Sequence, residues 1–219
     1  MSIISKLSSQ IGEKTEEGNR IAAKECIQNS ELLNELIEGF TSNDKALIGD
    51  CVEVFTKVSE EKPELIVPFT SLIFPLLTSN TTRIRWEAIH TISLLTPYIP
   101  EQISSLLPAI REKIHTDKST IVRDYSVQTI CNFAEIGEPE ALAAFPILKE
   151  ALSLWEGKHR GRILTGLLNV WMHFALPILI LMPSVPFSCC RINNNRLCRL
   201  VSMLRIPHIH FLLFYLLVR

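Results

Sequence analysis

The stretch VRDYSVQTI, from Val122 to Ile130, follows the same pattern as IRWEAIHTI, from Ile84 to Ile92, about 38 residues earlier. Both open on an aliphatic residue and an arginine, and both space apolar residues three and four positions apart, as one face of a helix requires. The same spacing recurs in one earlier and one later segment, which makes four copies. A repeat of this length is typical of stacked helix pairs, so the sequence predicts an all-α fold.

Prolines mark the places where one copy passes to the next. Pro63, Pro100 and Pro139 are each followed by a glutamate. Proline suits the first position of a helix because its missing N–H would be unpaired there, and the glutamate interacts favourably with the helix dipole. Polar turns rich in capping residues separate the two helices of each copy. We therefore expect a right-handed α-solenoid of about four antiparallel helix pairs over residues 31–170, with capping helices in residues 1–30 that cover the open end of the stack.

The best copy resembles a HEAT repeat, one of the armadillo-like helical repeats. It has a proline in the first helix at Leu106-Leu107-Pro108, an aspartate in the turn at Asp117, and Val122-Arg123 at the start of the second helix. The resemblance implies that Asp117 and Arg123 belong to a ladder between neighbouring units, with Arg85 in the arginine place of the preceding unit. The first unit departs from this pattern because it lacks the arginine. Armadillo repeats are the nearest structural alternative.

The resemblance also implies a function class, because HEAT proteins are interaction scaffolds. In such a stack the second helices line the concave side, where we expect partner-binding residues opposite the core stripe. These residues are Glu53, Trp86, His90, Asp124 and Gln128. Trp86 stands out because an exposed indole is a frequent binding hot spot. The alternative is that Trp86 packs against the neighbouring helix.

The net charge of −1 conceals an asymmetry. Through Glu156 the chain has 23 acidic and 14 basic residues, a net charge near −9, whereas the remainder is near +8. An acidic array disfavours nucleic-acid binding, since phosphate contacts need clustered lysine and arginine. It favours a basic protein partner.

The sequence contains no recognisable catalytic, cofactor or metal-ligand motif. Cys26, Cys51 and Cys131 are isolated on helical segments, which is typical of small core residues in a reducing compartment. No apolar core of signal-peptide length follows the N-terminus, so we expect a cytoplasmic, non-enzymatic protein. One alternative is a HEAT-like domain that processes a ligand or nucleic acid, but the acidic Glu53 and Asp124 oppose the basic concave face it would need.

Residues 171–219 form an apolar, basic tail without the repeat pattern. No acidic residue follows Glu156, and no Asp, Glu, Lys or Arg occurs from Ile163 to Cys190. A run of this length is long enough to cross a bilayer. Three interpretations stay open: a membrane anchor, which would make the protein a membrane-anchored adaptor, a buried end-cap, or the product of a shifted reading frame. Membrane association is expected only through this tail.

Overall fold

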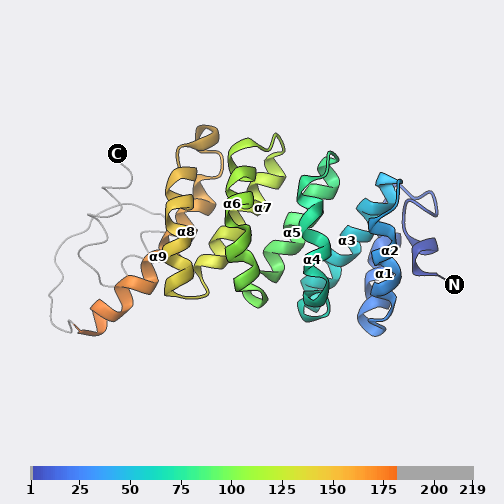
Figure 1. Ribbon diagram of the computed structural model, residues 1–219, viewed down its shortest axis with the longest axis horizontal. Coiled ribbons are helices and arrows are strands. Elements are labelled where there is room, and N and C mark those ends of the chain that lie inside the picture. The colour runs from blue at the N-terminus through green and yellow to red at the C-terminus, as the bar shows by residue number, and fades with distance from the viewer. Residues whose placement is uncertain (1, 182–219) are drawn as a thin grey trace, which may run out of the picture. The chain divides into compact units, whose positions relative to one another are not determined.

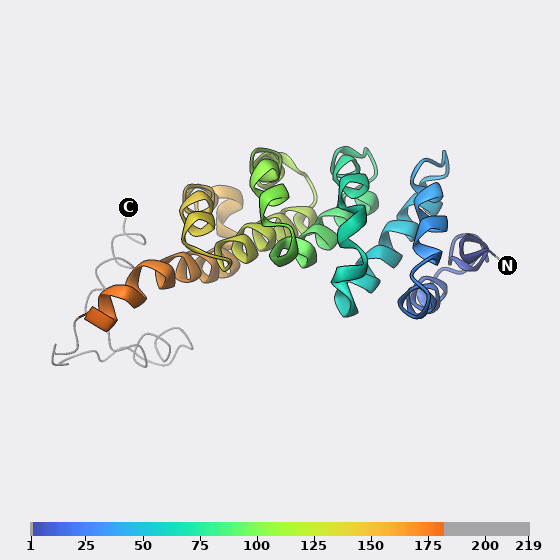
Figure 2. The same ribbon diagram turned by 60° about the horizontal axis from the view of Figure 1, so that its bottom comes forward.

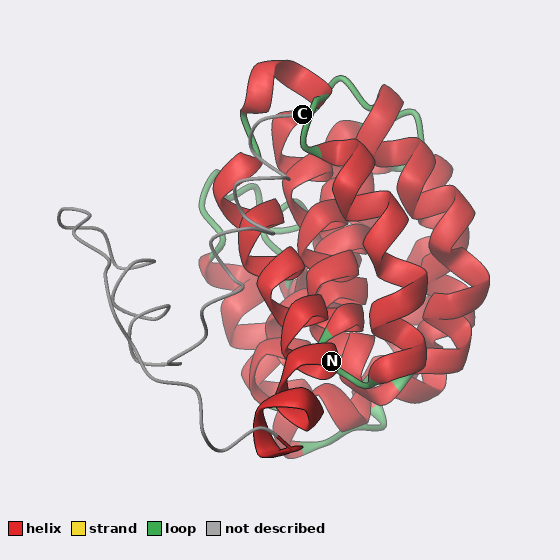
Figure 3. Cartoon of the chain, turned by 90° about the vertical axis from the view of Figure 1, so that its left-hand side faces the viewer, coloured by secondary structure: helices red, strands yellow, loops and turns green. Residues whose placement is uncertain are grey.

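The chain folds into helices joined by short turns, and a computed structural model describes residues 2–181, with side chains as far as residue 173. It divides after Trp171 into two units, and the solenoid is the first of them, Met1–Trp171. Figure 1 shows the helices of this unit stacked in chain order. No strand occurs between residues 2 and 181 (Figure 3). The predicted all-α solenoid is confirmed.

The helices form two layers (Figure 2). One layer contains α1, α3, α5, α7 and the start of α9, and the other contains α2, α4, α6 and α8, each packed on the first layer. The α-helices are α1 (Glu17–Gln28), α2 (Leu32–Phe40), α3 (Lys45–Glu61), α4 (Thr70–Ile73), α5 (Thr82–Leu95), α6 (Pro100–Thr116), α7 (Thr120–Ala134), α8 (Glu138–Ala151) and α9 (Arg160–Leu181). Short 3-10 helices are η1 (Ile3–Lys6), η2 (Pro63–Leu65), η3 (Val67–Phe69), η4 (Phe74–Thr78), η5 (Thr96–Tyr98) and η6 (Leu154–Gly157).

Helix α7 shows how the repeat pattern becomes a core. Its apolar positions Val122, Val127, Ile130 and Phe133 are all buried between the two layers. Each such side chain stabilises the fold by roughly 1.5–3 kcal/mol through removal of apolar surface from water. Ser119 precedes the helix, and its hydroxyl oxygen accepts a hydrogen bond from the Val122 N–H at 3.4 Å. Apolar spacing and the polar cap thus agree on where this helix lies.

The first helix of the second repeat, over residues 63–78, is broken, although each repeat is expected to hold a pair of helices. Three prolines, Pro63, Pro68 and Pro75, divide it into η2, η3, α4 and η4. Each proline removes a backbone donor and crowds the preceding turn, so closely spaced prolines prevent a regular ladder. By contrast, α6 continues across the single Pro108.

The N-terminal cap, expected to consist of helices in residues 1–30, contains the short 3-10 turn η1 and the helix α1. Between residue 2 and the start of α1, the one helical element is the turn Ile3–Lys6. Glu35 of α2 holds this turn, because its carboxylate accepts hydrogen bonds from the Ser2 hydroxyl at 2.7 Å and the Ile3 N–H at 3.0 Å. Ile3 and Leu7 are nevertheless buried, so a turn anchored by a carboxylate places the apolar residues in the core.

Glycines allow two pairs of neighbouring helices to approach closely. A Cβ atom added at Gly39 of α2 would lie 2.4 Å from the Sγ of Cys51 in α3, and one added at Gly166 of α9 would lie 2.4 Å from the Sγ of Cys131 in α7. Both cysteines are buried core residues. The absence of a side chain on each glycine therefore sets the spacing of the two helices.

The part of the chain from residue 2 to residue 181 contains no helix that is both long and apolar enough to span a membrane. Residues 182–219, which make up most of the predicted tail, lie outside the described residues.

Candidate protein-interaction surface

A row of contacts crosses the second helices of successive units. The His90 ring of α5 stacks on the Tyr125 ring of α7, with 3.9 Å between ring centroids, and His90 Nε2 lies 4.0 Å from a carboxylate oxygen of Glu60 in α3. Gln128 lies one turn after Tyr125 and accepts a hydrogen bond from Arg162 of α9. We call this row, Glu60, His90, Tyr125, Gln128 and Arg162, together with the half-buried Trp86 of α5 and Asp124 of α7, the second-helix face.

The centre of this face is aromatic and uncharged at neutral pH. Trp86 lies one turn before His90 and is half-buried; its indole Nε1 is sealed from solvent and has no hydrogen-bond partner among the described residues. Burial, with a smaller effect of the Lys57 charge, lowers the pKa of His90 to about 4. Trp86 is thus neither fully exposed nor fully buried, so the structure agrees with neither of the two sequence-based alternatives alone.

Glu53 does not belong to the exposed face, which corrects the prediction of a partner-binding side chain there. It is only 3% exposed. Its Oε2 accepts hydrogen bonds from Asn19 of α1 at 2.9 Å and from Arg83 of α5 at 2.6 Å, and its Oε1 lies 3.1 Å from the ammonium group of Lys57. A buried carboxylate requires such partners, so the residue links three helices instead of meeting solvent.

Asp124 and Gln128 are half-buried and already have partners within the array. The guanidinium of Arg162 contacts both Asp124 carboxylate oxygens, at 2.8 and 3.2 Å, and also donates to Gln128. The ring Nδ1 of His159 lies 3.2 Å from Asp124 Oδ1. These two predicted site residues therefore join α7 to the start of α9, and Arg162 is the residue that connects them.

A second buried carboxylate belongs to Glu87, the residue that follows Trp86 in α5. Glu87 of α5 accepts a hydrogen bond at 2.8 Å from the Thr56 hydroxyl of α3, and that hydroxyl lies 2.9 Å from the hydroxyl of Thr91. Burial raises the pKa of Glu87 to about 7. No described cation pairs with it directly, so it differs from the ion-paired Glu53.

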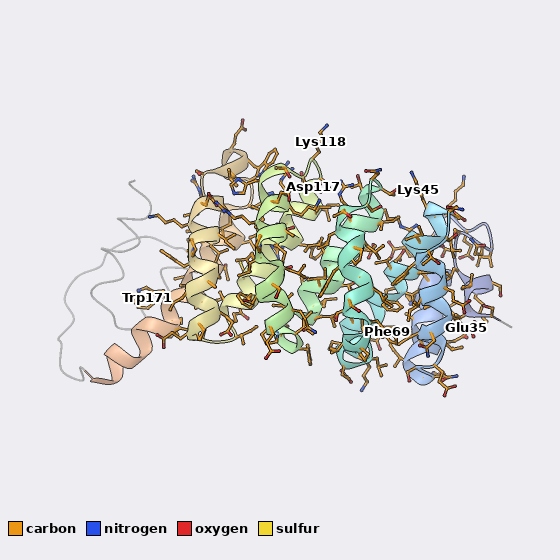
Figure 4. All side chains as sticks on the ribbon, viewed as in Figure 1. Glu35, Lys45, Phe69, Asp117, Lys118 and Trp171 are labelled. Atoms are coloured by element: carbon orange, nitrogen blue, oxygen red, sulfur yellow. The ribbon has the colours of Figure 1, made fainter. Side chains whose placement is uncertain are left out.

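The inter-unit ladder uses a different pairing from the predicted one. Both Asp117 carboxylate oxygens accept from the Arg85 guanidinium, at 2.8 and 3.2 Å, across a unit boundary. Arg123 instead donates to the Asp117 backbone carbonyl at 2.6 Å, within its own unit. Asp117 lies in the turn between α6 and α7, as Figure 4 shows. Because Arg85 approaches that turn from the preceding unit, it takes the carboxylate, and the expected Asp117–Arg123 ion pair is not formed.

Comparisons with known proteins address the fold. No model of a known protein family and no curated protein matches the sequence. An engineered protein aligns over 78% of this chain and 80% of its own, with a TM-score of 0.58 and 15% identity. A designed armadillo repeat protein, solved in complex with the peptide (KR)4, aligns over 77% of this chain and 88% of its own, with a TM-score of 0.59 and 17% identity. The chain has an armadillo-like helical-repeat fold. A computationally designed armadillo repeat protein for modular peptide recognition agrees over 76% of this chain and 80% of its own, with a TM-score of 0.53 and 18% identity.

Three residues outside the predicted site share one position of the repeat, which the repeat spacing alone would identify. Asp50, Glu87 and Tyr125 occupy equivalent positions in three successive units, at spacings of 37 and 38 residues. In each unit this position faces the neighbouring second helix, through an ion pair, a hydroxyl bond or a ring stack. One position in the repeat thus contacts the neighbouring helix in all three units, with different chemistry in each.

A groove adjoins the second-helix face between α7 and α9 of the armadillo-like array. It has a volume of about 330 Å³. Its lining residues are Gln128, Cys131, Glu135, Gly161, Arg162, Thr165 and Asn169. Amide, carboxylate and guanidinium groups along its walls can donate and accept hydrogen bonds, so the groove suits a polar segment of another chain.

Proposed function

We propose that the chain is a non-enzymatic, cytoplasmic scaffold that binds another protein through the second-helix face. Trp86, His90, Asp124 and Gln128 are the contact residues of this proposal. The observation that carries it is the group formed by the half-buried Trp86 and the stacked His90 and Tyr125 rings on adjacent helices. Half-buried aromatic side chains on a rigid surface are the usual anchors of protein interfaces.

The partner that fits this proposal is a basic, extended segment. The chain through Glu156 has a net charge near −9, and Glu60 at one end of the second-helix face has a half-exposed carboxylate. A designed relative in fold was solved with a peptide of alternating lysine and arginine. Opposite charge increases the association rate and selects the class of partner, while the aromatic centre contributes affinity.

The proposal is tested with the full chain and a fluorescently labelled peptide of alternating lysine and arginine. Anisotropy should show saturable binding that weakens with added salt. Trp86→Ala should weaken binding by about 30-fold, which corresponds to the loss of a hot spot of roughly 2 kcal/mol. Circular dichroism should show unchanged helix content.

Phe145→Ala is the matched control, because Phe145 is an aromatic residue of α8 with 37% exposure in the other layer. Its substitution should leave the affinity unchanged. Equal losses in the two variants, or binding of a polyglutamate peptide as tight as that of the basic one, would contradict the assignment of this face.

A further inference from the structure

Arg123 is a buried cation without a carboxylate partner. It is 4% exposed, and its three guanidinium nitrogens contact no carboxylate among the described residues. They donate to the Asp117 backbone carbonyl at 2.6 Å, the Thr120 hydroxyl at 3.2 Å and His159 Nε2 at 3.4 Å. The ring of Trp155 covers its other side, with the guanidinium carbon 3.8 Å from the ring centroid. Buried charges in proteins normally have a counter-charge, and no described acidic residue supplies one here.

The preceding repeat contains the carboxylate partner that Arg123 lacks. Arg85 holds the equivalent position, and it also donates to a backbone carbonyl of its own turn, that of Ser79, while the carboxylate of Asp117 neutralises its charge. One repeat length after Asp117 stands Trp155. The carboxylate place of the ladder is therefore taken by an indole face, and the positive charge of Arg123 remains.

A second cation converges on the same hydroxyl. The ammonium group of Lys158 lies 3.4 Å from the Thr120 Oγ1, which already accepts from Arg123. Thr120 is half-buried and is the first residue of α7, so the positive end of the helix dipole adds to the two side-chain charges. A neutral hydroxyl placed between two cations is a position where a doubly negative group would be favoured.

We propose that Thr120, Arg123 and Lys158 form a site for a phosphoryl group, carried covalently by Thr120 or bound as free phosphate. In the covalent form a separate protein kinase transfers the γ-phosphoryl group of a nucleoside triphosphate. The Thr120 Oγ–P bond forms, the bond from the γ-phosphorus to the bridging oxygen breaks, the nucleoside diphosphate leaves, and the hydroxyl proton passes to a base of the kinase. The phosphoryl oxygens then accept from Arg123 and Lys158 and join α7 to the turn before α9.

The test uses the full chain with phosphothreonine incorporated at position 120. Thermal unfolding at pH 7.5 should show a rise in Tm of about 3 °C or more, since the modification adds charge-assisted hydrogen bonds. The matched control is phosphothreonine at position 82. Thr82 begins α5 as Thr120 begins α7, but its nearby arginines already have carboxylate partners, Arg85 with Asp117 and Arg83 with Asp50. Because both positions share the helix N-terminus, a larger rise at position 120 isolates the contribution of Arg123 and Lys158.

Two further measurements distinguish a covalently attached phosphoryl group from free phosphate. They also test the role of Lys158 without changing a buried residue. Lys158→Met changes an exposed side chain and should remove a substantial part of the rise at position 120. A saturable rise in the Tm of the unmodified chain with inorganic phosphate, compared with chloride at equal ionic strength and reduced in Lys158→Met, would identify free phosphate as the source. Equal shifts at positions 82 and 120 would overturn the proposal, and so would the absence of a rise in both the covalent and the phosphate arms.

Discussion

At the scale of single residues, Glu87 makes the free energy of unfolding depend on pH. Its carboxyl group is buried and accepts a hydrogen bond from Thr56, and burial raises its pKa to about 7, well above the ordinary value of 4.5. Between these values the folded chain keeps a proton that the unfolded chain has lost, so the free energy of unfolding falls as pH rises through this window. His90 has the opposite sign. Its pKa is lowered to about 4, so its contribution to stability rises between about pH 4 and 6.5.

Glu87→Gln should therefore stabilise the chain at pH 8, by roughly 1–3 kcal/mol, and change little at pH 4.5. Glutamine keeps the shape and an oxygen for Thr56 but cannot ionise. Chemical denaturation at a series of pH values measures the difference. In the variant, the free energy of unfolding should still rise with pH between about 4 and 6.5, because His90 is unchanged. A variant whose curve runs parallel to that of the unmodified chain from pH 4.5 to 8 would show that Glu87 does not titrate there.

At the scale of elements, the ladder pair holds neighbouring units together. Arg85 and Asp117 have side chains that are 14% and 3% exposed. Burial disfavours the Asp117 carboxylate, but hydrogen bonds from Arg85 and the Ser119 N–H outweigh it and hold the pKa of Asp117 below its usual value. Its stabilising contribution is thus present above about pH 4 and is lost as pH falls through the lowered pKa.

Arg85→Ala should lower the free energy of unfolding by about 3–5 kcal/mol at pH 7, because it leaves a buried carboxylate unpaired. Arg111→Ala is the control. Arg111 pairs with Glu150 between α6 and α8, but its side chain is 53% exposed, and removing such a solvent-screened pair should change stability far less than removing the buried one. Urea denaturation compares the two. Similar losses in both variants would show that burial of the ladder pair has no special importance.

The approach of α9 to α7 depends on Gly166. An added Cβ would lie 2.4 Å from Cys131 Sγ and 3.0 Å from Leu148 Cδ1, so Gly166→Ala should destabilise the chain by about 1–3 kcal/mol through overpacking. Gly161→Ala, in the same helix with nothing within 4 Å of the added atom, should be neutral or stabilising by up to about 1 kcal/mol. Thermal melts of both variants check this. Adding Cys131→Ala should partly restore Gly166→Ala; no restoration would mean that the contact with Cys131 is not the cause.

At the scale of the whole molecule, the repeat pattern alone determined the fold class. Apolar residues three and four apart, recurring about every 38 residues, predict helix pairs that must stack to bury their faces, and the buried positions of α7 agree with that pattern. The prolines at the unit boundaries likewise follow a local rule, since Pro100 begins α6. Ala88 and Ser126, which take the same place in the repeats of α5 and α7, are both fully buried.

Only the tertiary structure decided which polar residues bind each other. Glu53 and Gln128 are equivalent in register, yet the first is buried because Asn19 and Arg83 reach it from neighbouring helices. Asp117 pairs with Arg85 and not with Arg123 because the partner comes from another unit. Helical periodicity is a property of each segment and can be deduced from spacing, whereas ion pairs and burial depend on how neighbouring helices turn their side chains toward one another. That geometry is set by packing between units, which the local sequence does not contain.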